Sequence, residues 1–343
     1  MAKPKRPQSK SASATPRKPG APAAKPGRPP QHRSGHPRGK SKAPGVVPKA
    51  RARDWIAAAR IPTLPLIVTP VAIGTAAAYV LHDGPATDWH WLRALACLAV
   101  AVSLQLGVNF ANDYSDGIRG TDAVRTGPRR LTASGAAKPR TVLAVAIVCF
   151  ALAAIAGLLV AWRSGHWWFI AVGAACIAAA WFYTGGKRPY GYMALGEVAV
   201  FLFFGPVATL GTMFALASTV TLEAWLGAIA AGAFATAAIL IANTRDRAQD
   251  AVVGKRTLSV LIGDRPSRIL YAALLAIPYA VLAAFAVLLY DTAGYVFFTL
   301  LLALPAAIIA LTAKTSRELV TVLKLTALTS VAYGLGLAAA IAL

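Results

Sequence analysis

Long apolar runs, each of about 20 residues, follow one another from Trp55 to the C-terminus and are separated by short polar stretches. A helix of about 20 apolar residues is long enough to cross the hydrocarbon core of a bilayer. The pattern therefore predicts an all-α integral membrane protein, a bundle of about nine transmembrane helices. We place the spans at residues 55–81, 91–113, 141–162, 167–184, 193–217, 222–244, 269–290, 293–313 and 319–343.

Basic residues gather on one side of this predicted bundle. The loops that follow spans two, four, six and eight are rich in Lys and Arg, whereas the loops between them hold almost none. Cytoplasmic loops of membrane proteins carry an excess of basic residues. We therefore expect these loops and the N-terminus in the cytoplasm, which leaves the C-terminus of a nine-span protein outside.

The first 50 residues differ in composition from the rest of the chain. They hold half of the 22 prolines, and 15 of the 35 Lys and Arg residues precede Asp54, where no acidic residue occurs. Such a segment buries too little apolar surface to offset its chain entropy. We expect residues 1–50 to be a disordered basic cytoplasmic tail that favours anionic lipid headgroups, followed by a membrane domain of residues 51–343.

Two polar clusters with the same spacing close spans two and six. Amide or carboxylate residues occupy relative positions 0, 3 and 7 in both, which fall on one face of a helix: Asn109, Asn112 and Asp116, then Asn243, Asp246 and Asp250. The chain has only 13 acidic residues, and five lie in these two regions: Asp113, Asp116, Asp122, Asp246 and Asp250.

The chemistry of these clusters favours a bound metal and a phosphate group. Amide and carboxylate oxygens suit Mg²⁺, which usually lies between one or two carboxylates and the phosphates of a substrate. A helix C-terminus disfavours acids, so two matched acidic clusters at such ends indicate function. Guanidinium groups in the same loops can bind phosphate oxygens. We predict a Mg²⁺-dependent diphosphate site at the cytoplasmic membrane surface.

Residues 60–264 resemble the UbiA superfamily of intramembrane prenyltransferases. The Asn-Asp-x-x-Asp element of that family is similar to the stretch at Asn112, and its Asp-x-x-x-Asp element to the stretch at Asp246. Its Tyr-x-x-x-Lys element matches Tyr183 and Lys187. Four longer stretches resemble the MenA-type branch, the 1,4-dihydroxy-2-naphthoate polyprenyltransferases: NDYSDGIRGTD, GPRRLTASG, YTGGKRPYGYMALGE and NTRDRAQDAVVGKRTL.

The resemblance implies a central cavity open to the cytoplasm, Mg²⁺ as cofactor, and polyprenyl diphosphate and 1,4-dihydroxy-2-naphthoate as substrates. It also implies prenyl transfer with loss of the ring carboxylate, giving demethylmenaquinone at a bacterial plasma membrane. The implied metal-binding residues are Asn112, Asp113, Asp116, Asp122, Asp246 and Asp250. The implied diphosphate-binding residues are Arg60, Arg125, Arg130, Tyr183 and Lys187. The implied catalytic residues are Asp116, Asp246, Asp250 and Lys187.

Several alternatives stay open from the sequence. Glu197, an acid inside span five, is a candidate to orient the aromatic substrate or to pair with a basic neighbour. The acceptor could be 4-hydroxybenzoate, a homogentisate-like ring or haem, although the GPRRL and GKRTL stretches favour the naphthoate. An ion-coupled transporter would place its acids near the bilayer midplane, and a scaffold would act through its basic tail. No nucleic-acid partner is expected.

Overall fold

The structure is a computed structural model that describes residues 49–85, 89–122 and 130–343. The predicted tail, except for its last two residues, and Arg125 lie outside these ranges. Within them the chain is almost wholly helical. The elements are α1 (Ala52–Ala58), η1 (Ile61–Thr63), α2 (Pro65–Tyr79), α3 (Trp91–Arg119), α4 (Pro139–Ser164), α5 (Phe169–Phe182), η3 (Tyr190–Tyr192), α6 (Gly196–Leu202), η4 (Phe203–Val207), α7 (Ala208–Ala217), α8 (Leu222–Val252), α9 (Leu258–Ile262), α10 (Asp264–Leu288), η5 (Asp291–Thr299), α11 (Leu300–Thr312) and α12 (Ser316–Ala342).

The helices agree with the predicted spans. In the described part of the chain, seven helical segments are long and apolar enough to cross a membrane, and the bent pair α1/η1–α2 makes an eighth. The remaining predicted span, the fourth (residues 167–184), corresponds to α5, an apolar helix of 14 residues. The protein is therefore a multi-pass membrane protein with an all-α fold, as the sequence predicted.

Proline accompanies a bend in one span and a π-helical turn in another. Helix α2 is bent by 45° from the segment before it, and in that segment Arg60, between α1 and η1, has a left-handed backbone with φ of 54°. The fifth span contains one π-helical turn, η4, with Pro206 inside it. Since proline lacks an N–H group and crowds the preceding turn, a helix adjusts its bonding locally at such a site.

Helix α2 packs against α7, α8 and α12. Small residues allow these close approaches, because a Cβ at Gly334 would come within 2.7 Å of the Thr69 side chain. At the same crossing the Thr69 hydroxyl donates to the Ser330 carbonyl oxygen at 2.8 Å. Small residues and inter-helix hydrogen bonds are the usual means by which helices pack in lipid.

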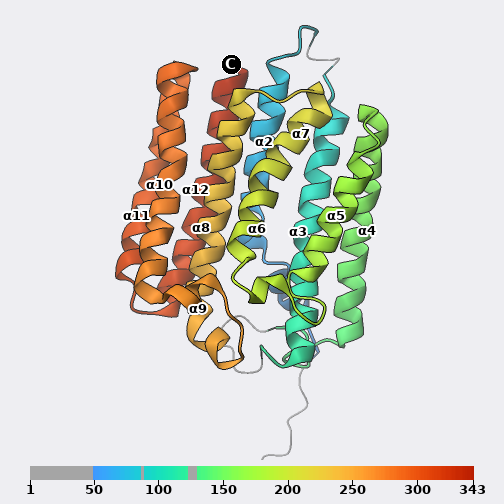
Figure 1. The fold of residues 1–343 in the computed structure, drawn as a ribbon, viewed down its shortest axis with the longest axis vertical. Helices are drawn as coiled ribbons and strands as arrows, with labels where there is room; N and C mark the ends of the chain where they lie inside the picture. The colour runs from blue at the N-terminus through green and yellow to red at the C-terminus, as the bar shows by residue number, and fades with distance from the viewer. Residues whose placement is uncertain (1–48, 86–88, 123–129) are drawn as a thin grey trace, which may run out of the picture. The chain divides into compact units, whose positions relative to one another are not determined.

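Helices α3 and α8 end at the same end of the bundle, beside α9, whereas the C-terminus lies at the opposite end (Figure 1). Both helices continue beyond the predicted spans, to Arg119 and Val252 instead of residues 113 and 244. Each acidic motif is therefore helical throughout. The two motifs face one membrane surface together, which agrees with their predicted placement.

Cysteine labelling tests which surface this is. Val252 is 78% exposed at the end of α8, and Asp83 is exposed in the loop after α2 at the other end of the bundle. In a variant without the native cysteines, we expect an impermeant maleimide to label Val252→Cys only in inside-out vesicles. It should label Asp83→Cys only in intact cells. The reverse pattern would contradict the orientation given by the positive-inside rule.

Candidate active site

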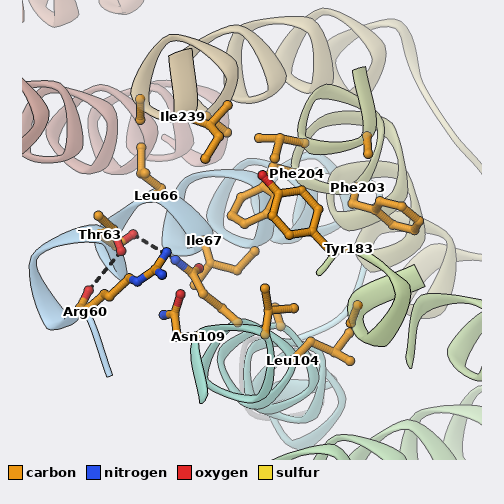
Figure 2. A pocket seen from close by; sticks show the side chains of 18 of the residues that line it. Arg60, Thr63, Leu66, Ile67, Leu104, Asn109, Tyr183, Phe203, Phe204 and Ile239 are labelled. Atoms are coloured by element: carbon orange, nitrogen blue, oxygen red, sulfur yellow. Dashed lines mark hydrogen bonds between the residues drawn. The ribbon is translucent and has the colours of Figure 1, made fainter. Parts of the chain in front are cut away.

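A cavity of about 620 Å³ runs through the bundle, walled by α2, α3, α5, η4, α8 and α12. Most of its wall is apolar, with Leu104 and Phe203 among the lining residues. Many of its polar residues come from the ends of α3 and α8 and from the segment before α2, and others come from the loops at that end and from α12. Figure 2 shows Arg60 and Asn109 on one side of the pocket and the rings of Tyr183, Phe203 and Phe204 on the other.

The first motif brings Asn112 and Asp116 to the cavity wall. The Tyr192 hydroxyl donates to Asp116 Oδ1 at 2.7 Å, and the Thr184 hydroxyl donates to Asn112 Oδ1 at 2.6 Å. Arg119 donates to the carbonyl oxygens of Thr184 and Gly186. These bonds fix the loop after α5 against the end of α3.

The protonation state of Tyr192 follows from its surroundings. It lies in η3, outside the membrane-spanning helices. Burial and then the negative charge of Asp116 raise the pKa of Tyr192 above that of a free phenol. The phenol therefore stays protonated at neutral pH, so it remains a donor to the Asp116 carboxylate.

The second motif pairs each of its acids with a base. Arg245 donates to both oxygens of Asp246, at 2.7 and 2.8 Å. Lys255 Nζ lies 3.6 Å from Asp250 Oδ1 and 5.4 Å from the ring centroid of Tyr192. Lys255 thus links the two motifs, because Tyr192 also bonds Asp116.

Glu197 has a neighbour in the second motif. The Asn243 side-chain N–H donates to Glu197 Oε1 at 2.9 Å, and Glu197 is only 4% exposed. Asn243 lines the cavity, whereas Glu197 is not part of its wall. In the structure Glu197 therefore orients an amide at the cavity surface.

The loop after α3 is held by two further acids. Both oxygens of Asp113 accept backbone N–H groups, from Leu131 at 3.0 Å and Thr132 at 2.8 Å. Asp122 pairs with Arg130, with Nε 3.4 Å from Oδ2. Asp113 is fully buried, so its position ties the loop to the helix, and Asp122 orients a base that lines the cavity.

The cavity collects part of the predicted residue set. The lining residues from that set are Arg60, Asn112, Asp116, Arg130, Tyr183 and Asp246. Those outside the wall are Asp113, Asp122, Asp250, Lys187 and Glu197. Lys187 is exposed on the loop after α5, and Arg125 lies outside the described residues.

Tyr192, Arg245 and Lys255 were not in the predicted set of site residues, although all three lie within the quoted motif stretches. Arg245 and Lys255 are among the loop bases that the sequence offers for phosphate binding, but their pairing with the motif acids was not predicted. No signal in the sequence indicated Tyr192. Only the fold shows that they contact the motif acids.

The oxygen atoms at the cavity wall fit a hard cation whose remaining coordination positions are filled by a bound substrate. Among residues 49–85, 89–122 and 130–343, no three His, Cys, Asp or Glu side chains are grouped closely enough to hold a metal ion. The cavity wall instead combines amides and carboxylates, Asn112, Asp116, Asn243 and Asp246. Mg²⁺ commonly takes one or two carboxylates and fills its remaining positions with substrate phosphate and water.

Comparison with known families agrees with this architecture. The model of the UbiA prenyltransferase family matches residues 70–340, and the chain belongs to this family. A 1,4-dihydroxy-2-naphthoate octaprenyltransferase of Mycobacterium tuberculosis is 44% identical over 292 residues, covering 84% of this chain and 97% of that protein. The Escherichia coli protein of the same name is 35% identical over 243 residues, covering 69% of this chain and 77% of that protein.

Solved structures show the same fold. The apo structure of a UbiA homologue from Aeropyrum pernix K1 aligns with a TM-score of 0.61 at 18% identity, covering 79% of this chain and 96% of that one. A UbiA homologue from Archaeoglobus fulgidus, bound to DMAPP and Mg²⁺, aligns with a TM-score of 0.57 at 14% identity, covering 83% and 99%.

The contacts of Asp113 predict a structural role that can be measured. Asp113→Ala leaves the buried N–H groups of Leu131 and Thr132 without their acceptor, which should cost about 2–4 kcal/mol of stability. We expect a clearly lower midpoint of thermal unfolding in detergent. Asp83→Ala, in an exposed loop, should unfold like the wild type. Equal midpoints for both variants would contradict the role of Asp113.

Proposed function

We propose that this protein transfers a polyprenyl group from polyprenyl diphosphate to 1,4-dihydroxy-2-naphthoate, with loss of the ring carboxylate, in menaquinone biosynthesis. The observation that carries the proposal is one cavity in which Asn112, Asp116 and Asp246 meet a long apolar wall. A polyprenyl diphosphate needs polar residues for its diphosphate and an apolar wall for its chain in the same cavity. The naphthoate follows from the relatives of that name in two bacterial species.

The polar end of the cavity would bind the diphosphate. Oxygens of Asn112, Asp116, Asp246 and Asp250 would hold Mg²⁺, and Asp113 and Asp122 would support this site indirectly, through the residues they bind. When bound, Mg²⁺ neutralises charge that develops on the leaving diphosphate. Arg60, Arg125, Arg130, Tyr183 and Lys187 would add positive charge or hydrogen-bond donors, an electrostatic stabilisation that is strongest where water is excluded.

The apolar wall would protect the reacting carbon. As the carbon–oxygen bond to the diphosphate breaks, its electron pair leaves with the diphosphate, and an allylic cation remains. Phe203, Phe204 and Leu104 line the cavity and would exclude the water that could capture this cation. The electron-rich ring attacks instead. Loss of the carboxylate as carbon dioxide returns its bonding electrons to the ring.

The orientation of the protein belongs to the same proposal. We infer that the end of the bundle with both motifs faces the cytoplasm of a bacterial cell and that the C-terminus is extracytoplasmic. The supporting observation is the excess of Lys and Arg in the loops at that end. The basic tail, residues 1–50, would then lie on the side with anionic lipid headgroups.

Removing one charge from each motif should stop the reaction. We expect Asp116→Asn and Asp250→Asn each to lower turnover by at least about a hundredfold, the scale of losing one preorganised electrostatic contact. EDTA should stop the wild-type enzyme, and Mg²⁺ should restore it. Mn²⁺ binding in the presence of pyrophosphate, followed by electron paramagnetic resonance, should weaken in both variants. Near-normal Mg²⁺-dependent turnover by both would refute a site built from two motifs.

The fate of the carboxylate tests the acceptor. With carboxyl-labelled naphthoate, we expect labelled carbon dioxide in equal amount to the prenylated product, and only when polyprenyl diphosphate and Mg²⁺ are both present. A smaller acceptor, 4-hydroxybenzoate, fills less of the apolar cavity and should react poorly. Efficient prenylation of 4-hydroxybenzoate without reaction of the naphthoate would reject the proposed acceptor and leave the diphosphate site in place.

A further inference from the structure

Lys324 is a basic residue inside the last membrane-spanning helix, α12. It lies about 12 Å along the helix from Ser316, at a rise of about 1.5 Å per residue. Together with Val320 and Leu323 it lines the cavity. It belongs to neither acidic motif. An ionisable side chain that faces a cavity within a membrane is expensive to keep and commonly has a function.

Lys324 differs from other bases around the cavity in its ion pairing. Arg130, Arg245 and Lys255 each form an ion pair with an acid of the motif regions. Within the described part of the chain, no carboxylate lies within 4.0 Å of the Lys324 ammonium group. Its positive charge is therefore available to an anion that enters the cavity.

The helices that pack against α12 contribute apolar residues to the cavity wall. Helix α12 packs against α2 and α8, and these helices contribute Leu66 and Ile239 to the same wall. Figure 2 shows Leu66 and Ile239 near Thr63 at the pocket. The motif acids, by contrast, all come from α3, α8 and the loop after α3. Lys324 thus adds charge from α12, a helix that carries no motif acid.

We propose that Lys324 binds the carboxylate of the aromatic acceptor, an inference that rests on the proposed function. A carboxylate that leaves water for an apolar cavity needs a compensating charge, and an ammonium group supplies a compact one. The contact exists in the bound substrate and is lost as neutral carbon dioxide forms. Lys324 therefore contributes to acceptor binding more than to the chemical step.

Two acceptor rings, one with a carboxylate and one without, distinguish carboxylate binding by Lys324 from other roles. The test uses full-length protein in nanodiscs, with binding of 1,4-dihydroxy-2-naphthoate compared with the uncharged 1,4-dihydroxynaphthalene under anaerobic conditions. We expect Lys324→Met to weaken naphthoate binding by about tenfold or more, the scale of one charge-assisted hydrogen bond. Binding of the uncharged ring should not change, and Lys324→Arg should restore most of the loss. Arg317→Met should match the wild type, because Arg317 is exposed like Lys324 and lies on the same helix but does not line the cavity.

Kinetics provide a second measurement. In Lys324→Met we expect a higher KM for the naphthoate, with kcat and the KM for polyprenyl diphosphate unchanged. An equal loss of affinity for both rings would indicate packing, and a raised KM for the diphosphate alone would indicate a donor contact. Unchanged binding of the naphthoate would also overturn the proposal. Failure of the wild type to bind or prenylate the naphthoate would instead reject the proposed function, and this inference with it.

Discussion

Acidic side chains at helix C-termini are the constraint on which this structure depends. The helix dipole and the nearby hydrocarbon both oppose a negative charge at the ends of α3 and α8. Each acid is therefore given a partner: Tyr192 for Asp116, Arg245 for Asp246 and a lysine for Asp250. These partners hold the site in place before any ligand arrives. The segments that carry these partners, η3, the end of α8 and the loop after α8, all lie at this end of the bundle.

The second requirement is a cavity that joins charge to an apolar wall. Two irregular segments contribute to it: Arg60 lies between α1 and η1, and Phe203 and Phe204 belong to the π-helical turn. Residues of both segments line the cavity. The left-handed backbone at Arg60 costs about 1–2 kcal/mol, which the surrounding packing must offset. Strain of this kind is commonly found at functional sites.

The sequence was sufficient for the spans and for the placement of the motifs, because apolar length and periodicity are local properties. All nine spans have helical counterparts, and both motifs lie at one end of the bundle. Contacts between distant segments could not be read in the same way. The Tyr192–Asp116 bond joins residues 76 positions apart, and the bonds of Asp113 to the backbone of Leu131 and Thr132 cross a loop.

A structure with Mn²⁺ and an unreactive prenyl thiodiphosphate tests the central claim most directly. In the proposed site, the ends of α3 and α8 hold metal and diphosphate together. Anomalous scattering should then place Mn²⁺ between Asp116 and Asp246, with the diphosphate beside it and the prenyl chain along the apolar wall. Metal bound to one helix end alone, or a diphosphate outside the cavity, would contradict the account.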